Sequence, residues 1–171
     1  MMTLVSALLL CLAKAPEQSA PKEDLRPVTL HVAGISCASC AGPVREALTK
    51  VPGVKDVEVS TEEKFARFKF DAQKTPVQAL MRALLGEDDH FPSRLALQLE
   101  SPKAEPETID KARLAIAAVP GVRAMSQPDG EGIVLITFHL DKVTLLPELL
   151  QTAKAAGLPM REPPLKKSSR P

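Results

Sequence analysis

The four residues V-P-G-V occur twice in the chain, at positions 51–54 and 119–122, a shift of 68 residues. A Pro-Gly pair ends a helix and turns the chain, and each copy stands between an apolar helical stripe and a stretch that leads into strand-like alternation. Self-similarity at a fixed period is typical of tandem structural units. The repeat therefore predicts two units of one fold, which we place at residues 27–93 and 94–160.

The first unit shows the patterns of three strands and two helices. Alternation of period two covers residues 28–32, 57–59 and 66–70, and apolar helical stripes cover residues 39–51 and 77–85. Residues 75–78, T-P-V-Q, match a capping box at the start of the second helix. The order βαββα, completed by one more strand, predicts an α+β fold, the ferredoxin-like βαββαβ sandwich with two helices on one face of an antiparallel sheet.

The loop between the first strand and the first helix carries Cys37 and Cys40 in a C-x-x-C spacing. On a loop that runs into a helix, this spacing lets both sulfurs converge on one point, and the positive end of the helix favours thiolate over thiol. Thiolates are soft ligands, and two of them with no other obvious donor suit Cu(I), Hg(II) or another soft d10 ion better than calcium, magnesium or manganese. The spacing predicts a site for one soft metal ion.

The sequence around this loop resembles the heavy-metal-associated domain of copper chaperones, of the N-terminal tails of metal-transporting P-type ATPases and of periplasmic mercury-binding proteins. The resemblance rests on G-I-S-C-A-S-C, followed by V-R-E-A-L and V-P-G-V-K-D-V-E-V in the matching element order. It implies that Cys37 and Cys40 carry the metal and that the protein is a metal chaperone or scavenger, not an enzyme. Ile35 and Ser36 stand where the family usually has Met and Thr; Ile35 can still anchor the loop and Ser36 keeps a hydroxyl.

The loop after the second helix, which in that family lies beside the metal, contains Asp88, Asp89 and His90. Carboxylates close to an anionic bis-thiolate site would weaken it by like-charge repulsion, unless they point away. His90 is a candidate auxiliary nitrogen ligand, although a lone histidine in a polar loop is usually solvated. His31 and His139 fall on the polar phases of their strands, and we expect them to be solvated.

Copper(I) is the cargo that we expect first, with Hg(II), Zn(II) and Cd(II) as alternatives, because two soft thiolates do not distinguish these ions. The expected partners are the metal ion and a metal-transporting ATPase or another metal-handling protein. Thiol–disulfide exchange and a purely structural disulfide stay as competing functions. The order of elements favours metal binding, because a thioredoxin-like enzyme needs a parallel βαβ core.

The second unit repeats the pattern without the thiols, since the shift of 68 puts Glu105 and Thr108 opposite Cys37 and Cys40. We therefore expect a degenerate copy with no soft-metal site. Residues 95–100 are assigned to this unit as its first strand, because a first strand is central in this fold and a last strand, at an edge, is easier to lose. Later patterns predict a helix at 109–119, a strand at 134–140 and a helix at 145–156.

Residues 1–26 have the features of a signal peptide and linker. An apolar run at 4–13 is followed by A-K-A and then by a segment rich in Pro, Lys and acids, although no Lys or Arg precedes the run. Removal of this segment would leave Cys37 and Cys40 as the only cysteines. We expect a periplasmic or secreted protein, with a cytoplasmic location as the alternative.

Composition excludes two other classes of protein. A net charge of +1 and the absence of Trp and Tyr leave no basic or aromatic footprint for nucleic acid. The N-terminal apolar run is too short to cross the roughly 30 Å hydrocarbon core of a membrane, so we expect no span in the mature chain. Residues 161–171 are expected to form a disordered tail.

Overall fold

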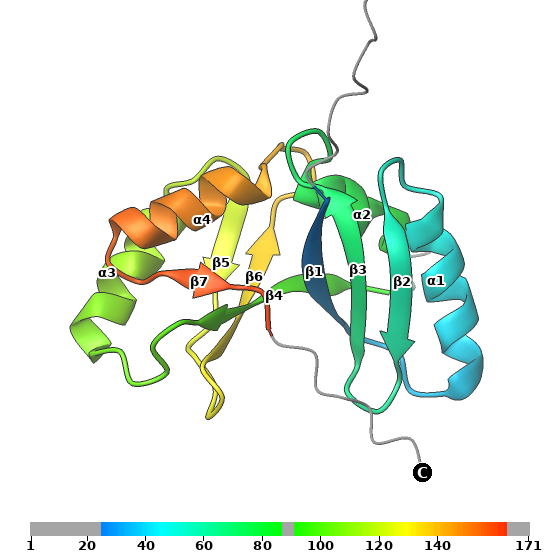
Figure 1. The fold of residues 1–171 in the computed structure, drawn as a ribbon, viewed down its shortest axis with the longest axis horizontal. Coiled ribbons are helices and arrows are strands. Elements are labelled where there is room, and N and C mark those ends of the chain that lie inside the picture. Colours follow the sequence, from blue (N-terminus) through cyan, green and yellow to red (C-terminus); the bar gives the residue numbers. More distant parts are fainter. Residues whose placement is uncertain (1–24, 87–90, 164–171) are drawn as a thin grey trace, which may run out of the picture.

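Strands from both halves of the chain join in one seven-stranded sheet. In the computed structural model, which describes residues 25–86 and 91–163, the strand order is β2-β3-β1-β4-β6-β5, with β7 also paired to β4 (Figure 1). The first half supplies β1 (Leu25–Val32), the short 3-10 helix η1 (Ala38–Cys40), α1 (Ala41–Thr49), β2 (Lys55–Ser60), β3 (Phe65–Asp71) and α2 (Val77–Leu85). The rest supplies β4 (Ser93–Leu99), α3 (Pro106–Ala117), β5 (Val122–Met125), β6 (Ile133–Phe138), α4 (Leu146–Ala155) and β7 (Met160–Arg161).

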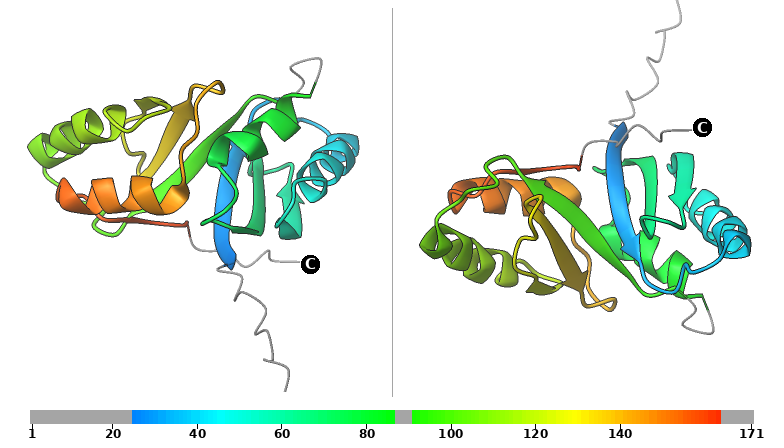
Figure 2. Two further views of the ribbon diagram at one scale, coloured as in Figure 1. Left: turned by 90° about the horizontal axis from the view of Figure 1, so that it is seen from above. Right: turned by 90° about the horizontal axis from the view of Figure 1, so that it is seen from below.

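Strand β4 belongs to both units. One of its edges pairs antiparallel with β1, from Val32↔Ser93 to Thr29↔Ala96, and further along with β7 at Leu99↔Met160. The opposite edge pairs with β6. The orders β4-β1-β3-β2 and β7-β4-β6-β5 are therefore the same ferredoxin-like arrangement, with β4 as the last strand of the first unit and the first strand of the second (Figure 2).

This double role corrects the assignment of residues 95–100 to the second unit alone. A strand can serve two units when its two halves find different neighbours on the same edge and when its apolar side chains are buried in both halves. Leu95, Ala96, Leu97 and Leu99 are all 0% exposed. The three leucines, which alternate along the strand, join one hydrophobic cluster that continues through both units.

The helices pack on the sheet in the order that the repeat predicts. Helix α1 contacts β2 and α2, and α2 contacts β4; in the second unit α3 contacts β5 and α4, and α4 contacts β7. The register of the repeat is visible in the cores, because Val44 and Leu48 of α1 and their counterparts Ala112 and Ile116 of α3 are all fully buried. Helices α1 and α3 lie at opposite ends of the molecule (Figure 1).

Both copies of the V-P-G-V turn are held by the same hydrogen bond. Thr75 Oγ1, two residues before α2, donates to the carbonyl of Pro52 at 3.1 Å, and Thr144 Oγ1, two residues before α4, donates to the carbonyl of Pro120 at 2.6 Å. The repeat therefore extends to the threonine in front of each second helix. This link between turn and helix was not visible from hydrophobic patterns.

The capping box predicted at residues 75–78 does not form. Helix α2 begins at Val77 after Pro76, and no side chain caps it. Instead the amide of Val77 donates to the Thr144 carbonyl at 3.1 Å, and the Gln78 side chain turns to Thr144 as well. The second unit thus satisfies the amide of Val77, the first of the α2 amides that have no acceptor within the helix.

The ordered fold is longer at both ends than the sequence predicted. Leu25 and Arg26, expected in the linker, belong to β1, and Arg161, expected in the tail, belongs to β7. Met160, beside Arg161 in β7, is only 6% exposed, because it packs in the core. A two-residue strand is too short to show a period, so the hydrophobic pattern did not predict it.

Within the described residues, no helix is long and apolar enough to cross a membrane.

Candidate metal centre

The cysteine loop starts where β1 leaves the sheet. The amide of Ala33 donates to the carbonyl of Pro92 at 2.8 Å, which holds the start of the loop against the entry to β4. Gly34 then takes a positive φ of 89°, a conformation that glycine adopts without strain. Ile35 is 0% exposed, so the apolar anchor predicted at this position is confirmed. The buried Ile35 fixes the loop and leaves the residues after it at the surface.

Cys37 is the residue before η1, and Cys40 is the last residue of η1. The amide of Cys40 donates to the carbonyl of Cys37 at 3.0 Å, and α1 begins directly afterwards at Ala41. The first turns of η1 and α1 contain no acidic residue, so the positive end of the helix dipole is not neutralised locally. A negative charge on either sulfur is therefore favoured at this point of the fold.

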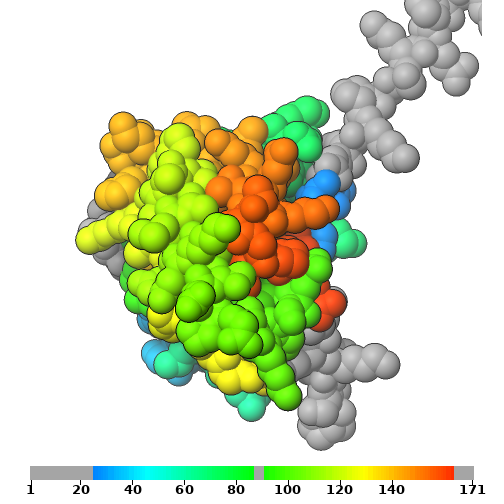
Figure 3. Space-filling model, turned by 90° about the vertical axis from the view of Figure 1, so that its left-hand side faces the viewer, coloured from blue at the N-terminus to red at the C-terminus, as the bar shows by residue number. Residues whose placement is uncertain are grey.

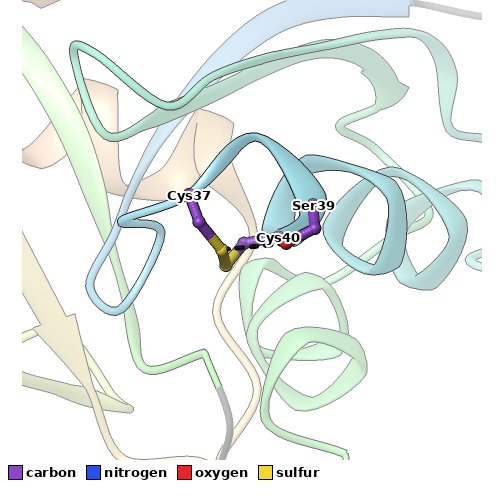
Figure 4. The surroundings of a disulfide bond; sticks show 3 residues. All are labelled: Cys37, Ser39 and Cys40. Atoms are coloured by element: carbon purple, nitrogen blue, oxygen red, sulfur yellow. Dashed lines mark hydrogen bonds between the residues drawn. A yellow bond between two sulfur atoms is a disulfide. The ribbon is translucent and has the colours of Figure 1, made fainter.

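The two sulfurs are joined in a disulfide, and their Cα atoms are 5.4 Å apart (Figure 4). Cys37 is exposed, whereas Cys40 is half-buried against the hydrophobic core. The Ser39 hydroxyl lies 3.1 Å from the Cys37 sulfur. The structure thus shows the oxidised pair: two electrons and two protons convert it to two thiols, which can then bind a soft ion as thiolates.

The described residues bring no further predicted ligand to this loop. His90, Asp88 and Asp89 lie outside the described residues. His139 is exposed and follows the end of β6. Among residues 25–86 and 91–163, no group of three or more His, Cys, Asp or Glu side chains is placed to hold a metal ion.

His31 is not fully solvated, in contrast to the prediction. Its ring packs edge-on against Phe65 with centroids 5.5 Å apart. Burial lowers the pKa of His31 from its ordinary value, and the positive charges of Arg94 and Lys64 lower it further. The strand that carries His31 ends before the cysteine loop, so this histidine belongs to the sheet and not to the cysteine pair.

Comparison with known proteins identifies the family. The model of the heavy-metal-associated domain matches residues 29–86. The mercuric transport protein periplasmic component of Salmonella typhi is 42% identical over 95 residues, which cover 56% of this chain and 98% of that protein. The chain belongs to the heavy-metal-associated domain family.

Two solved structures are similar to this heavy-metal-associated protein over 42% of its length. Oxidised MerP from Ralstonia metallidurans CH34 is 38% identical, covering 42% of this chain and 96% of that one, with a TM-score of 0.38. The mercury-bound form of MerP, the periplasmic protein of a bacterial mercury detoxification system, is 41% identical, covering 42% and 96%, with a TM-score of 0.36. Family membership confirms the resemblance drawn from the G-I-S-C-A-S-C block and supports heavy-metal binding; the preference for copper stays a prediction.

The second unit repeats one backbone hydrogen bond of the cysteine loop and has no cysteine at either position. The amide of Thr108 donates to the carbonyl of Glu105 at 3.0 Å, the counterpart of the hydrogen bond from Cys40 to Cys37. Glu105 is exposed, and α3 begins directly after it. The turn therefore remains as a helix start, without a soft ligand at either position.

Proposed function

We propose that the protein carries one Hg(II) ion in the periplasm, bound between the thiolates of reduced Cys37 and Cys40, and passes it to a metal-handling partner. The observation that supports this most directly is the cysteine pair of η1, in which Cys37 is exposed and Cys40 is half-buried, with no cluster of three candidate ligands among the described residues. Mercury is put before copper because the relatives described above are named for mercuric transport.

The geometry suits a soft d10 ion that needs few ligands. Two thiols lose two protons as they bind the ion, and the positive end of the helix stabilises the thiolates that form. Because Cys37 is exposed, a third thiolate from a partner can approach the ion on that side. Bonding of this thiolate followed by release of one protein thiolate transfers the ion without any change in its oxidation state.

The cargo is tested by titrating the reduced protein with Hg(II), Cu(I), Zn(II) and Cd(II) in competition, without oxygen. We expect one tightly bound Hg(II) per chain, and no tight binding in Cys37→Ser or Cys40→Ser, since one thiolate cannot close a two-coordinate site. Ser36→Ala is the matched control, because it changes the neighbour of Cys37 and keeps both sulfurs. Tighter binding of Cu(I) than of Hg(II) would replace mercury by the copper predicted from sequence, and near-native affinity in both serine variants would overturn the site.

The auxiliary role of His90 is tested in the same titration with His90→Ala. An unchanged affinity would assign the site to the two sulfurs alone.

Location is tested separately, by mass spectrometry of the protein from its native host. We expect a mature N-terminus beyond Cys11, and an intact Met1 on protein from the cytoplasm would refute export.

A further inference from the structure

The two-residue strand β7 ends close to the place where β1 takes over its edge of the sheet. In β7, Arg161 is opposite Gln98 of β4. On the same edge of β4, Thr29 of β1 is opposite Ala96, two residues away. A longer β7 would therefore collide with β1, and the chain leaves the sheet after Arg161. Figure 3 shows the last described residues in red, at the surface beside the orange helix α4.

Beyond β7 the chain borders a cavity of about 730 Å³ on the face of the first-unit sheet opposite to α1 and α2 (Figure 2). Thr29 points to this face and is only 3% exposed, whereas its neighbour Leu30 belongs to the core on the other side. The lining consists of residues 161–163 and of three residues from each strand, 27–29 of β1, 56–58 of β2 and 67–69 of β3. Residues 161–163 thus form one wall of the cavity, and the described chain ends there.

The charges of the lining leave one carboxylate without a partner. Lys69 is paired with Asp56 at 2.8 Å. Arg67 is paired with Glu63 at 2.7 Å, although its Nε is buried without a hydrogen-bond partner. The adjacent residues Arg161 and Glu162 offset each other in charge. Glu58 on β2 is exposed and forms no ion pair with the described residues, so an occupant with a cation and with carbonyl oxygens would complement this lining.

We propose that the C-terminal segment, residues 164–171 of the same chain, occupies this cavity, with Leu165 against the strands and the lysine pair 166–167 beside Glu58. The segment continues directly from Pro163, which lines the cavity. Its sequence, P-L-K-K-S-S-R-P, holds one leucine, three cationic side chains and no acidic side chain. Eight extended residues reach about 26 Å, whereas β1 and β2 lie about 10 Å apart across β3.

The attachment of this segment favours it over a separate molecule. A segment tethered at the wall of the cavity has an effective concentration in the millimolar range. A second copy or a free peptide at micromolar concentration therefore needs an affinity about a thousandfold higher to displace it. The C-terminal segment would join the two units, because it leaves the second unit at β7 and lies on the sheet of the first. It would then be ordered, in place of the disordered tail expected from the sequence.

The test compares NMR spectra of the full chain with those of a chain that ends after Pro163, both with the cysteine pair oxidised. We expect the amide signals of residues 27–29, 56–58 and 67–69 to differ between the two chains. In the full chain, the backbone order parameters of residues 165–167 should be close to the value of about 0.85 for rigid backbone, and not below about 0.6 as in a flexible tail. The shortened chain keeps every described strand and helix, and circular dichroism checks that it folds.

A pair of variants tests the role of Leu165. Leu165→Glu should move the cavity signals to their positions in the shortened chain, because it removes the apolar side chain and places a carboxylate near Glu58. Ser169→Glu makes the same change in charge four residues later and is the matched control, which should keep the signals of the full chain.

Three results would overturn the proposal. They are identical cavity signals in the full and shortened chains, order parameters below about 0.6 at residues 165–167, and signal differences that grow with protein concentration, which would assign the cavity to a second copy. The cysteine loop does not line this cavity, so Hg(II) titration of the shortened chain should match that of the full chain. Failure of the proposal would therefore leave the proposed metal site unaffected.

Discussion

Gln78 and Thr144 join the two units through two buried hydrogen bonds. Gln78 Nε2 donates to Thr144 Oγ1 and the amide of Thr144 donates to Gln78 Oε1, both at 2.8 Å. Both residues are 0% exposed. A buried amide that loses its acceptor is left with its full desolvation penalty, so this pair couples the stability of α2 to that of the loop before α4.

The first prediction is that Gln78→Met destabilises the protein by about 1–3 kcal/mol, because it removes both hydrogen bonds while keeping most of the side-chain volume. Gln73→Met, at an exposed position in the turn before α2, is the matched control and should change stability by no more than about 0.5 kcal/mol. Urea unfolding measures both. Equal stabilities of the two variants would show that the buried pair contributes nothing.

The two V-P-G-V turns give a second prediction, because their glycines differ in surroundings. Gly53 and Gly121 have φ values of 84° and 89°, so alanine is strained at either position. A Cβ on Gly121 would lie 2.6 Å from Thr144 Oγ1 and 2.7 Å from Gln78 Nε2, whereas on Gly53 the nearest atom would be at 3.4 Å.

We expect Gly53→Ala to cost about 1–2 kcal/mol from its backbone conformation. Gly121→Ala should cost about 1–3 kcal/mol more, since it also displaces the Gln78–Thr144 pair. Gly130→Ala, with no atom within 4 Å of the added carbon, is the control. Thermal unfolding of the three variants would contradict this account if Gly121→Ala were no less stable than Gly53→Ala.

Local patterns predicted the parts of the structure that depend on neighbouring residues. The stripe of α1, the position of Cys37 and Cys40 at a helix start and the expectation of a soft metal ion follow from residues a few positions apart. The family resemblance then supported the same expectation. The double role of β4 did not follow, because alternation in residues 95–99 identifies a strand without showing which strands lie on its two edges. Gln78 matched a capping box and instead hydrogen-bonds with Thr144, 66 residues away.

The choice of metal could not be predicted for a chemical reason. Two thiolates at a helix start satisfy Cu(I) and Hg(II) alike, so the spacing of Cys37 and Cys40 fixes the softness of the cargo and not its identity. In the second unit, the turn is present and the thiols are absent. Its loop forms the backbone hydrogen bond between Thr108 and Glu105 without any cysteine, so the turn and the thiols are specified by different residues.

A third prediction concerns pH. The pKa of His31 is lowered in the folded protein, first by burial and then by Arg94 and Lys64, below its ordinary value of 6.5. The unfolded chain therefore takes up this proton at higher pH than the folded chain. The stability contributed by neutral His31 is present above pH 6.5 and is lost as the pH falls below it.

His31→Gln should therefore reduce the loss of stability on acidification through this range. Urea unfolding at a series of pH values measures the effect, and His139→Gln, at an exposed position outside the sheet, controls for the removal of a histidine as such. If the stability of His31→Gln fell with pH as steeply as that of the native protein, His31 would not be the source of this loss.

The last prediction follows from the shared strand and compares two shortened chains. A chain that ends after residue 92 lacks β4, so β1 loses its pairing from Thr29 to Val32 and α2 loses the strand on which it packs. A chain that ends after residue 100 keeps β4 but exposes Leu97 and Leu99 and loses the contact of Gln78 with Thr144. We expect the longer chain to fold with a free energy of unfolding lower than that of the full-length protein by about 3 kcal/mol or more. The shorter chain should lack a cooperative unfolding transition. Metal bound per chain should follow the folded fraction in each, because Cys37 and Cys40 are present in both. Cooperative unfolding of the shorter chain with the stability of the longer one would show that the first unit does not need β4.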